Sequence, residues 1–124
     1  MKKKVIASLF LAGSLFISSN AVFAGSYENY EKYNGYYYTE KDSCNSSGYS
    51  AMSKWESPTG TVKVSVQTYT YMAGEIAERE TRESDTRIGQ STISDTTSAK
   101  YQLAKVECKH YANDIIIRQI PLYP

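Results

Sequence analysis

The chain has 124 residues, and its 14 basic and 13 acidic residues leave a formal net charge of +1. This length fits a single domain. The basic residues are scattered among glutamates, as in Arg79–Glu83, and this pattern excludes the clustered lysines and arginines that nucleic-acid binding requires.

The first 24 residues have the order of a secretory signal peptide. Three lysines precede an apolar run, Val5–Ile17, and small residues lead to Ala24. The run is shorter than the roughly 20 residues that a membrane-spanning helix needs. We therefore expect a leader over residues 1–24, cleavage between Ala24 and Gly25, and a secreted mature chain with no transmembrane segment. The compact basic start and short apolar core are typical of a bacterial leader.

Cleavage would change the charge and redox setting of the chain. All 13 acidic residues but only 11 of the 14 basic ones follow the cut, so the mature charge is 11 − 13 = −2. In an exported chain the only two cysteines, Cys44 and Cys108, predict a disulfide; two buried free thiols are the alternative. Two cysteines and the single His110 fall short of a four-ligand metal site, and we expect neither metal nor cofactor.

The mature chain begins with a tyrosine-rich segment, residues 25–48. Six of the twelve tyrosines lie between Tyr27 and Tyr38, and four of them recur every third residue, a spacing that keeps side chains on one side of a helical turn. We expect this segment to be weakly structured until a disulfide through Cys44 fixes it.

Residues 49–124 carry the pattern of an antiparallel β domain. A short strand begins near Tyr49, a turn follows at Ser57–Gly60, and Thr61–Met72 alternates β-branched with polar residues as a half-buried strand does. The second clear strand is Tyr101–Ala112, in which Cys108 points inward beside Val106.

The remaining segments are less regular. Glu75–Glu83 fits either a short helix or a polar hairpin arm, and Thr86–Thr97 fits a bulged edge strand. Ile115–Ile120 is a last strand that Pro121 ends. About five strands predict an all-β fold, a small antiparallel β-sandwich or open barrel.

Catalytic patterns are poorly represented. His110 lies in the middle of a strand with no glycine-rich nucleophile turn in the sequence, and we interpret it as structural. The glutamates near Arg79 and Arg82 read as a solvated charged face rather than as paired catalytic carboxylates. We therefore expect that the protein is not an enzyme, with a small hydrolase as the third functional reading.

Tyrosines are the remaining candidates for function. Tyr69 and Tyr71 share the polar face of the strand Thr61–Met72 and, with Tyr36, Tyr37 and Tyr38, are our candidate ligand-binding residues, because tyrosine offers a flat apolar ring with a polar tip. The alternative is that Tyr69 and Tyr71 pack under a second sheet and that the N-terminal tyrosine run only covers the sandwich. We expect an extracellular binding module for a cell-surface glycan or protein; the alternative is a secreted antimicrobial or toxin-like β protein.

Overall fold

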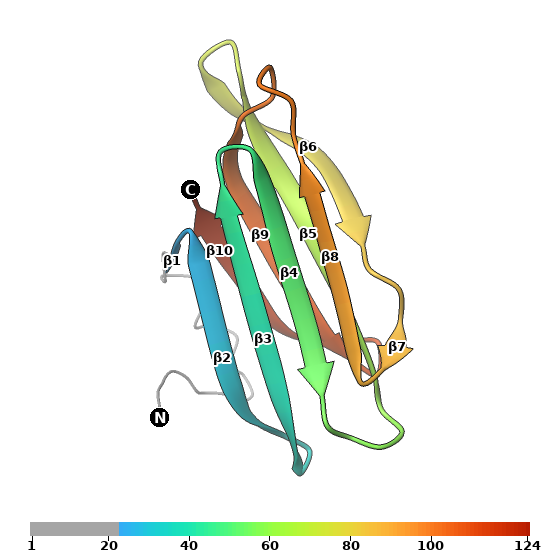
Figure 1. The fold of residues 1–124 in the computed structure, drawn as a ribbon. Helices are drawn as coiled ribbons and strands as arrows, with labels where there is room; N and C mark the ends of the chain where they lie inside the picture. The colour runs from blue at the N-terminus through green and yellow to red at the C-terminus, as the bar shows by residue number, and fades with distance from the viewer. Residues whose placement is uncertain (1–22) are drawn as a thin grey trace.

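The computed structural model describes residues 23–124, which form a sandwich of two β-sheets (Figure 1). Residues 1–22 of the predicted leader lie outside the described residues. The first sheet has the order β1-β10-β9-β5-β6, with β7 attached to β5, and the second has the order β2-β3-β4-β8. Pairing is antiparallel except between β1 and β10. The prediction of a small all-β sandwich is confirmed.

The strands have the following bounds. In the first sheet they are β1 (Phe23–Ala24), β5 (Thr61–Met72), β6 (Glu75–Glu83), β7 (Arg87–Ile88), β9 (Leu103–Ala112) and β10 (Ile115–Tyr123). In the second sheet they are β2 (Ser26–Tyr33), β3 (Tyr36–Asn45), β4 (Gly48–Trp55) and β8 (Gln90–Thr96).

Three two-residue turns fix the register of the hairpins. Both residues have positive φ at Asn34–Gly35 (49° and 86°), Ala73–Gly74 (54° and 84°) and Asn113–Asp114 (51° and 65°). Two-residue turns with positive φ at both positions match the right-handed twist of the strands that they join. The first turn places Tyr33 opposite Tyr36, which starts the register of the β2–β3 hairpin.

The side chains that alternate into the sandwich form two apolar clusters. The larger cluster consists of Cys44, Tyr49, Ala51, Val64, Val66, Leu103, Val106, Cys108, Ile120 and Leu122. The smaller cluster consists of Tyr38, Trp55, Val62 and Ala112. On β3 and β4, buried polar residues separate the members of one cluster from those of the other.

The smaller cluster depends on a glycine in the loop between β4 and β5. A Cβ atom at Gly60 would lie 2.2 Å from the ring of Trp55, so only glycine lets the loop pass over this ring. The indole Nε1 of Trp55 donates to the carbonyl of Tyr33 at 3.1 Å. Trp55 is therefore a core residue, held by both the loop and the β2–β3 hairpin.

Several sequence-based expectations differ from the structure. The tyrosine-rich segment is not weakly structured, because residues 26–45 form the β2–β3 hairpin. Of the two forms considered for Glu75–Glu83, a short helix or a hairpin arm, the structure has the hairpin arm, β6. Strand β10 continues through Pro121 to Tyr123; Pro121 lies near a sheet edge, where a missing N–H group is tolerated. These additional strands raise the number above the five that we expected.

Candidate functional site

The five tyrosines predicted to bind a ligand do not form one site. Tyr38 is a core residue, only 2% exposed, and its hydroxyl donates to the carbonyl of Tyr111 at 2.7 Å. Its assignment as a ligand-binding residue was wrong, because even-numbered residues of β3 face the inside of the sandwich. Tyr36 and Tyr37 are exposed at the start of the same strand.

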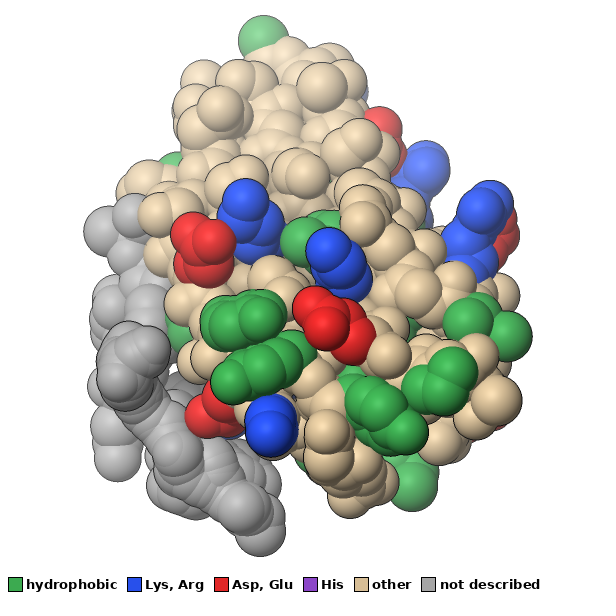
Figure 2. Space-filling model, turned by 60° about the horizontal axis from the view of Figure 1, so that its bottom comes forward, with side chains coloured by type: hydrophobic (Ala, Val, Ile, Leu, Met, Phe, Trp, Pro, Cys, Tyr) green, Lys and Arg blue, Asp and Glu red, His purple; other side chains and the backbone are tan. Residues whose placement is uncertain are grey.

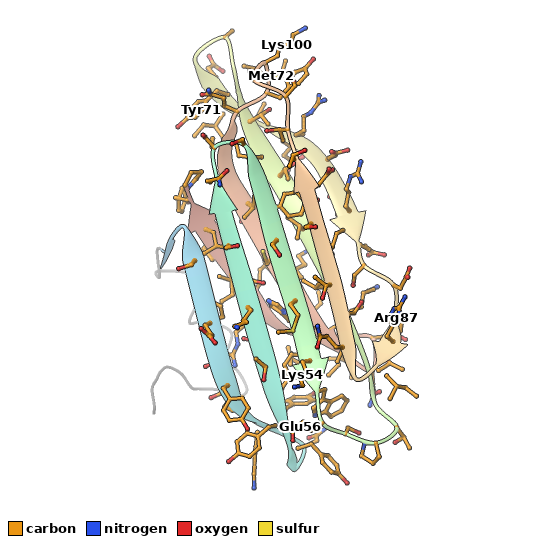
Figure 3. The ribbon with its side chains drawn as sticks, in the orientation of Figure 1. Lys54, Glu56, Tyr71, Met72, Arg87 and Lys100 are labelled. Atoms are coloured by element: carbon orange, nitrogen blue, oxygen red, sulfur yellow. The ribbon has the colours of Figure 1, made fainter. Side chains whose placement is uncertain are left out.

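Tyr69 and Tyr71 lie on the outer side of the other sheet. The hydroxyl of Tyr69 donates to the carboxylate of Glu107 at 3.1 Å, and the ammonium group of Lys105 lies 4.8 Å from the ring centroid. These contacts hold Tyr69 against the sheet, whereas Tyr71 is half exposed. Tyr71 and Met72 lie at the opposite end of the sandwich from Lys54 and Glu56 (Figure 3).

The other end carries a stacked pair of exposed tyrosines. The rings of Tyr30 and Tyr37 are 4.5 Å apart and inclined by 4°, and Lys32 lies 5.4 Å from the centroid of the Tyr37 ring. Desolvation and the nearby Glu56 carboxylate raise the pKa of Tyr30. The stack stands on the outer face of the second sheet, next to the turn that joins β2 to β3.

Three isoleucines lie at the same end of the sandwich, where β7 and the β9–β10 turn meet the start of β5 (Figure 1). We call the tyrosines and isoleucines together the hairpin end. Its members are Tyr30, Tyr36, Tyr37, Ile88, Ile115 and Ile116. They are six of the nine large exposed hydrophobic residues of the described chain. Figure 2 looks at this end and shows hydrophobic side chains interspersed with acidic and basic ones.

A layer of buried charged residues crosses the interior between the two sheets. The Nε2 atom of His110 on β9 lies 2.7 Å from a carboxylate oxygen of Asp42 on β3, and its Nδ1 atom lies 2.6 Å from the hydroxyl of Ser53 on β4. All three residues are buried. The order serine, histidine, aspartate is that of a catalytic triad, but all three side chains lie between the sheets rather than at the surface.

The burial of His110 and its partners points to a structural role. Burial alone lowers the pKa of His110, but the adjacent Asp42 carboxylate more than offsets this effect and raises the pKa above 6.5. When protonated, the ring donates from both nitrogens, to Asp42 and to Ser53, and the Ser53 hydroxyl then donates to the carbonyl of Lys63 at 3.4 Å. Ser53 and His110 are fully buried between the sheets, and a serine that no substrate reaches joins the sheets rather than attacking a substrate.

A second buried pair joins the sheets beside the first. The Nε atom of Arg118 on β10 lies 3.2 Å from the carboxylate of Glu40 on β3, and its terminal nitrogen donates to Glu31. The hydroxyl of Tyr27 also donates to Glu40 at 3.2 Å. Desolvation and the Glu40 charge raise the pKa of Tyr27, so this phenol stays protonated as a donor. Arginine and tyrosine therefore satisfy a carboxylate that is only 1% exposed.

The predicted disulfide is absent from the structure. Cys44 and Cys108 are both free and buried, in the larger apolar cluster. Burial raises the pKa of Cys44 to about 11 and that of Cys108 well above its usual value. Because the thiolate is the reactive form, folding suppresses the chemistry that a disulfide would need. The alternative of two buried thiols fits this structure.

Sequence reasoning missed Glu40, Asp42, Ser53 and Arg118, and it found His110 without its partners. Glu40 and Asp42 lay in the segment expected to be weakly structured. Ser53 lay in the short strand that begins near Tyr49, and Arg118 lay in the predicted last strand. One signal was available: Asn34–Gly35 is a strong indicator of a hairpin turn, and the hairpin register assigns the even-numbered residues of β3 to one face.

Comparisons with known proteins add no relative. No protein-family model matches the chain, and no curated protein or solved structure matches it. Within residues 23–124, no helix is long and apolar enough to span a membrane. No group of three or more histidine, cysteine or acidic side chains in the same range is arranged to hold a metal ion.

The charge on His110 predicts a pH-dependent stability. Since the folded-state pKa lies above the unfolded value of 6.5, the stabilisation is fully present below pH 6.5 and is lost as pH rises through the folded-state pKa. We expect the free energy of unfolding, measured with urea, to fall from pH 6 to pH 8.5. His110→Gln should flatten this dependence. A wild-type stability that rises over that range would contradict the protonation that we assign.

Removing one member of the second pair should destabilise the protein strongly. Arg118→Met leaves the Glu40 carboxylate buried without its main counter-charge, and we expect a loss of about 3–5 kcal/mol in urea unfolding. Adding Glu40→Gln removes the unpaired buried carboxylate and should restore part of the lost free energy of unfolding. Lys41→Met breaks the exposed pair with Glu28 and should cost about 0–1 kcal/mol. Equal losses for Arg118→Met and Lys41→Met would refute the proposed importance of the buried pair.

Proposed function

We propose that the protein is an extracellular binding module whose hairpin end contacts a protein partner. The leader pattern of residues 1–24 supports export from a bacterial cell. The observation that carries the proposal is the concentration of six large exposed hydrophobic side chains at one end of a rigid sandwich. Exposed apolar groups gathered on one face of a soluble protein typically mark an interaction surface.

The chemistry of this end favours a protein over other partners. Tyrosine is enriched at the centres of protein interfaces because its ring buries a large area at a low cost in conformational entropy. The aliphatic chains of Ile88, Ile115 and Ile116 can bury apolar area against a partner but offer no hydrogen bonds. Around the apolar residues, Lys32, Lys54 and Glu56 supply the polar rim that protein interfaces usually have.

A glycan is the second candidate, supported by the Tyr30–Tyr37 stack. Each ring has one face against its neighbour, which leaves the outer face of Tyr30 accessible for stacking on a sugar ring. A site of this kind would use the tyrosines alone, and the isoleucines would contribute nothing to it. The two candidate partners therefore depend on different residues of the hairpin end.

The test is binding of fluorescently labelled protein to intact cells of the source organism. We expect saturable binding that weakens at least about tenfold in the Tyr30→Ser/Tyr37→Ser variant, because aromatic residues at an interface centre carry much of its affinity. Tyr71→Ser, which removes an equally exposed tyrosine at the opposite end, should bind like the wild type.

Variants of the isoleucines and chemical treatments of the cell surface distinguish a protein partner from a glycan. For a protein partner, Ile115→Ser/Ile116→Ser and protease treatment of the cells should each reduce binding. For a glycan, periodate oxidation should abolish binding while the isoleucine variant binds normally. Undiminished binding by both the tyrosine and the isoleucine variants would show that the hairpin end is not the contact surface.

A further inference from the structure

Strand β8 is the last strand of the second sheet, and its outer edge has no neighbouring strand among the described residues. The backbone N–H of Trp55 donates to the carbonyl of Gly89, and that of Thr97 to the carbonyl of Ser47. Odd-numbered residues of this segment therefore bond to β4 or its adjoining turn. In antiparallel pairing the alternate residues direct their N–H and C=O groups to the other side. Those of β8 are Gln90, Thr92, Ser94 and Thr96, and of these Thr96 already donates its N–H to the carboxylate of Asp95 at 2.8 Å.

The edge of β8 lacks the charges that protect the other edges. Six of the nine residues of β6 are charged, as are three of the eight residues of β2. Charged side chains on an edge strand discourage pairing with another chain. Strand β8 has a single charged residue in seven, Asp95, and that side chain points to the inside of the sandwich. Of these three edges, β8 is the one best suited to accept a strand.

The first sheet extends beyond β8, so that the face of β6 lies next to the open edge of β8. Strand β8 packs over β5, and β6 continues past it on the outer side (Figure 1). The inner face of β6 is given by the residues paired with inward-facing positions of β5, namely Ala77, Glu80 and Arg82. A strand with one covered face shows alternating burial, but β6 is exposed at every position except Ala77, which is half-buried.

The charges along this edge favour a basic occupant. The Nε atom of Arg82 lies 3.2 Å from the carboxylate of Asp95 and 3.6 Å from that of Glu80. Two carboxylates thus share one guanidinium group and leave a local excess of negative charge. At the lower end of the edge, a pocket of about 280 Å³ lies between the β6–β7 connection and the start of β8. Its lining includes Asp85 and Arg87, and Figure 3 shows the place of Arg87.

We propose that β8 and β6 form a receiving site for an extended peptide segment of a partner protein. The segment pairs with the free edge of β8 as a fifth strand of the second sheet and lies over the inner face of β6. Side chains directed inward contact Ala77 and include a basic group near Asp95 and Glu80. Main-chain hydrogen bonds supply the affinity in this mode of recognition, and alternate side chains supply the specificity. This site is separate from the hairpin end and does not depend on it.

A second copy of the chain fits this edge poorly. Antiparallel pairing of β8 with β8 of another copy is related by a twofold axis perpendicular to the sheet. Both β6 strands would then lie on the same side, and each projects beyond its own β8 into the space of the other. A single strand fits beside β8, whereas a second complete sandwich collides with β6.

The test uses the seven-residue peptide acetyl-Thr-Lys-Thr-Val-Thr-Lys-Thr-amide with ¹⁵N-labelled protein. Its lysines and valine share one face and can meet Glu80, Asp95 and Ala77, while its threonines lie beside the hydroxyl side chains of β8. We expect chemical-shift changes and slower amide hydrogen exchange at Thr92 and Ser94. The same peptide with glutamate in place of lysine should bind more weakly.

A matched pair of variants at one position tests the pairing itself. Ser94→Pro removes a backbone N–H group that the fold does not use, a change tolerated on an edge strand, and should weaken peptide binding by about tenfold. Ser94→Ala keeps the N–H group and should bind like the wild type.

Three results would overturn the proposal. They are the absence of shift changes along β8 at millimolar peptide, equal binding by Ser94→Pro and Ser94→Ala, and concentration-dependent dimerisation that Ser94→Pro abolishes. The last would identify a second copy as the occupant. Loss of cell binding in the hairpin-end variants leaves all three readouts unchanged, so the two proposals can fail independently.

Discussion

The buried charged layer between the sheets is the constraint on which the rest of the sandwich depends. Asp42 meets His110 and Glu40 meets Arg118, and each pair joins β3 of one sheet to a strand of the other. Removing such charges from water is costly, and the cost is recovered only when every partner is in place. A slip of β3 by one residue would turn both carboxylates outward. His110 and Arg118 would then be buried without their carboxylate partners. The layer therefore specifies how the sheets face each other, while the two apolar clusters on either side of it supply the hydrophobic stabilisation.

This arrangement also separates the interior chemistry from the surfaces available to partners. The histidine, serine and aspartate lie in a catalytic order but are buried between the sheets, where they act as a structural bridge. What the molecule presents to its surroundings is an apolar end with a tyrosine stack and a sheet edge with few charges. Both surfaces stand on a scaffold that cross-sheet charge pairs and three tight turns hold in register, which suits recognition by preformed surfaces.

The strands that alternate apolar and polar residues could be predicted from the sequence, and the charged layer could not. Thr61–Met72 and Tyr101–Ala112 follow the expected period of two, so β5 and β9 were located correctly. In β3 the inward positions are Tyr38, Glu40, Asp42 and Cys44. Two carboxylates on the buried face interrupt the usual alternation of apolar and polar residues, and the strand was therefore not predicted. The partner of Asp42 lies 68 residues further along the chain, a pairing that only the assembled sandwich reveals. The spacing of three among the tyrosines pointed to a helical turn, whereas the Asn34–Gly35 turn makes a hairpin that places Tyr38 in the core and Tyr37 at the surface.

The protonation state of His110 tests this account most directly. The ¹⁵N chemical shifts of its ring nitrogens can be followed from pH 5 to pH 9 in the folded protein. We predict a transition from imidazolium to neutral shifts with a pKa above 6.5, because the adjacent Asp42 carboxylate favours the charged ring more than burial disfavours it. A ring that is already neutral below pH 6.5 would contradict the claim that ionised pairs buried between the sheets hold the sandwich in register.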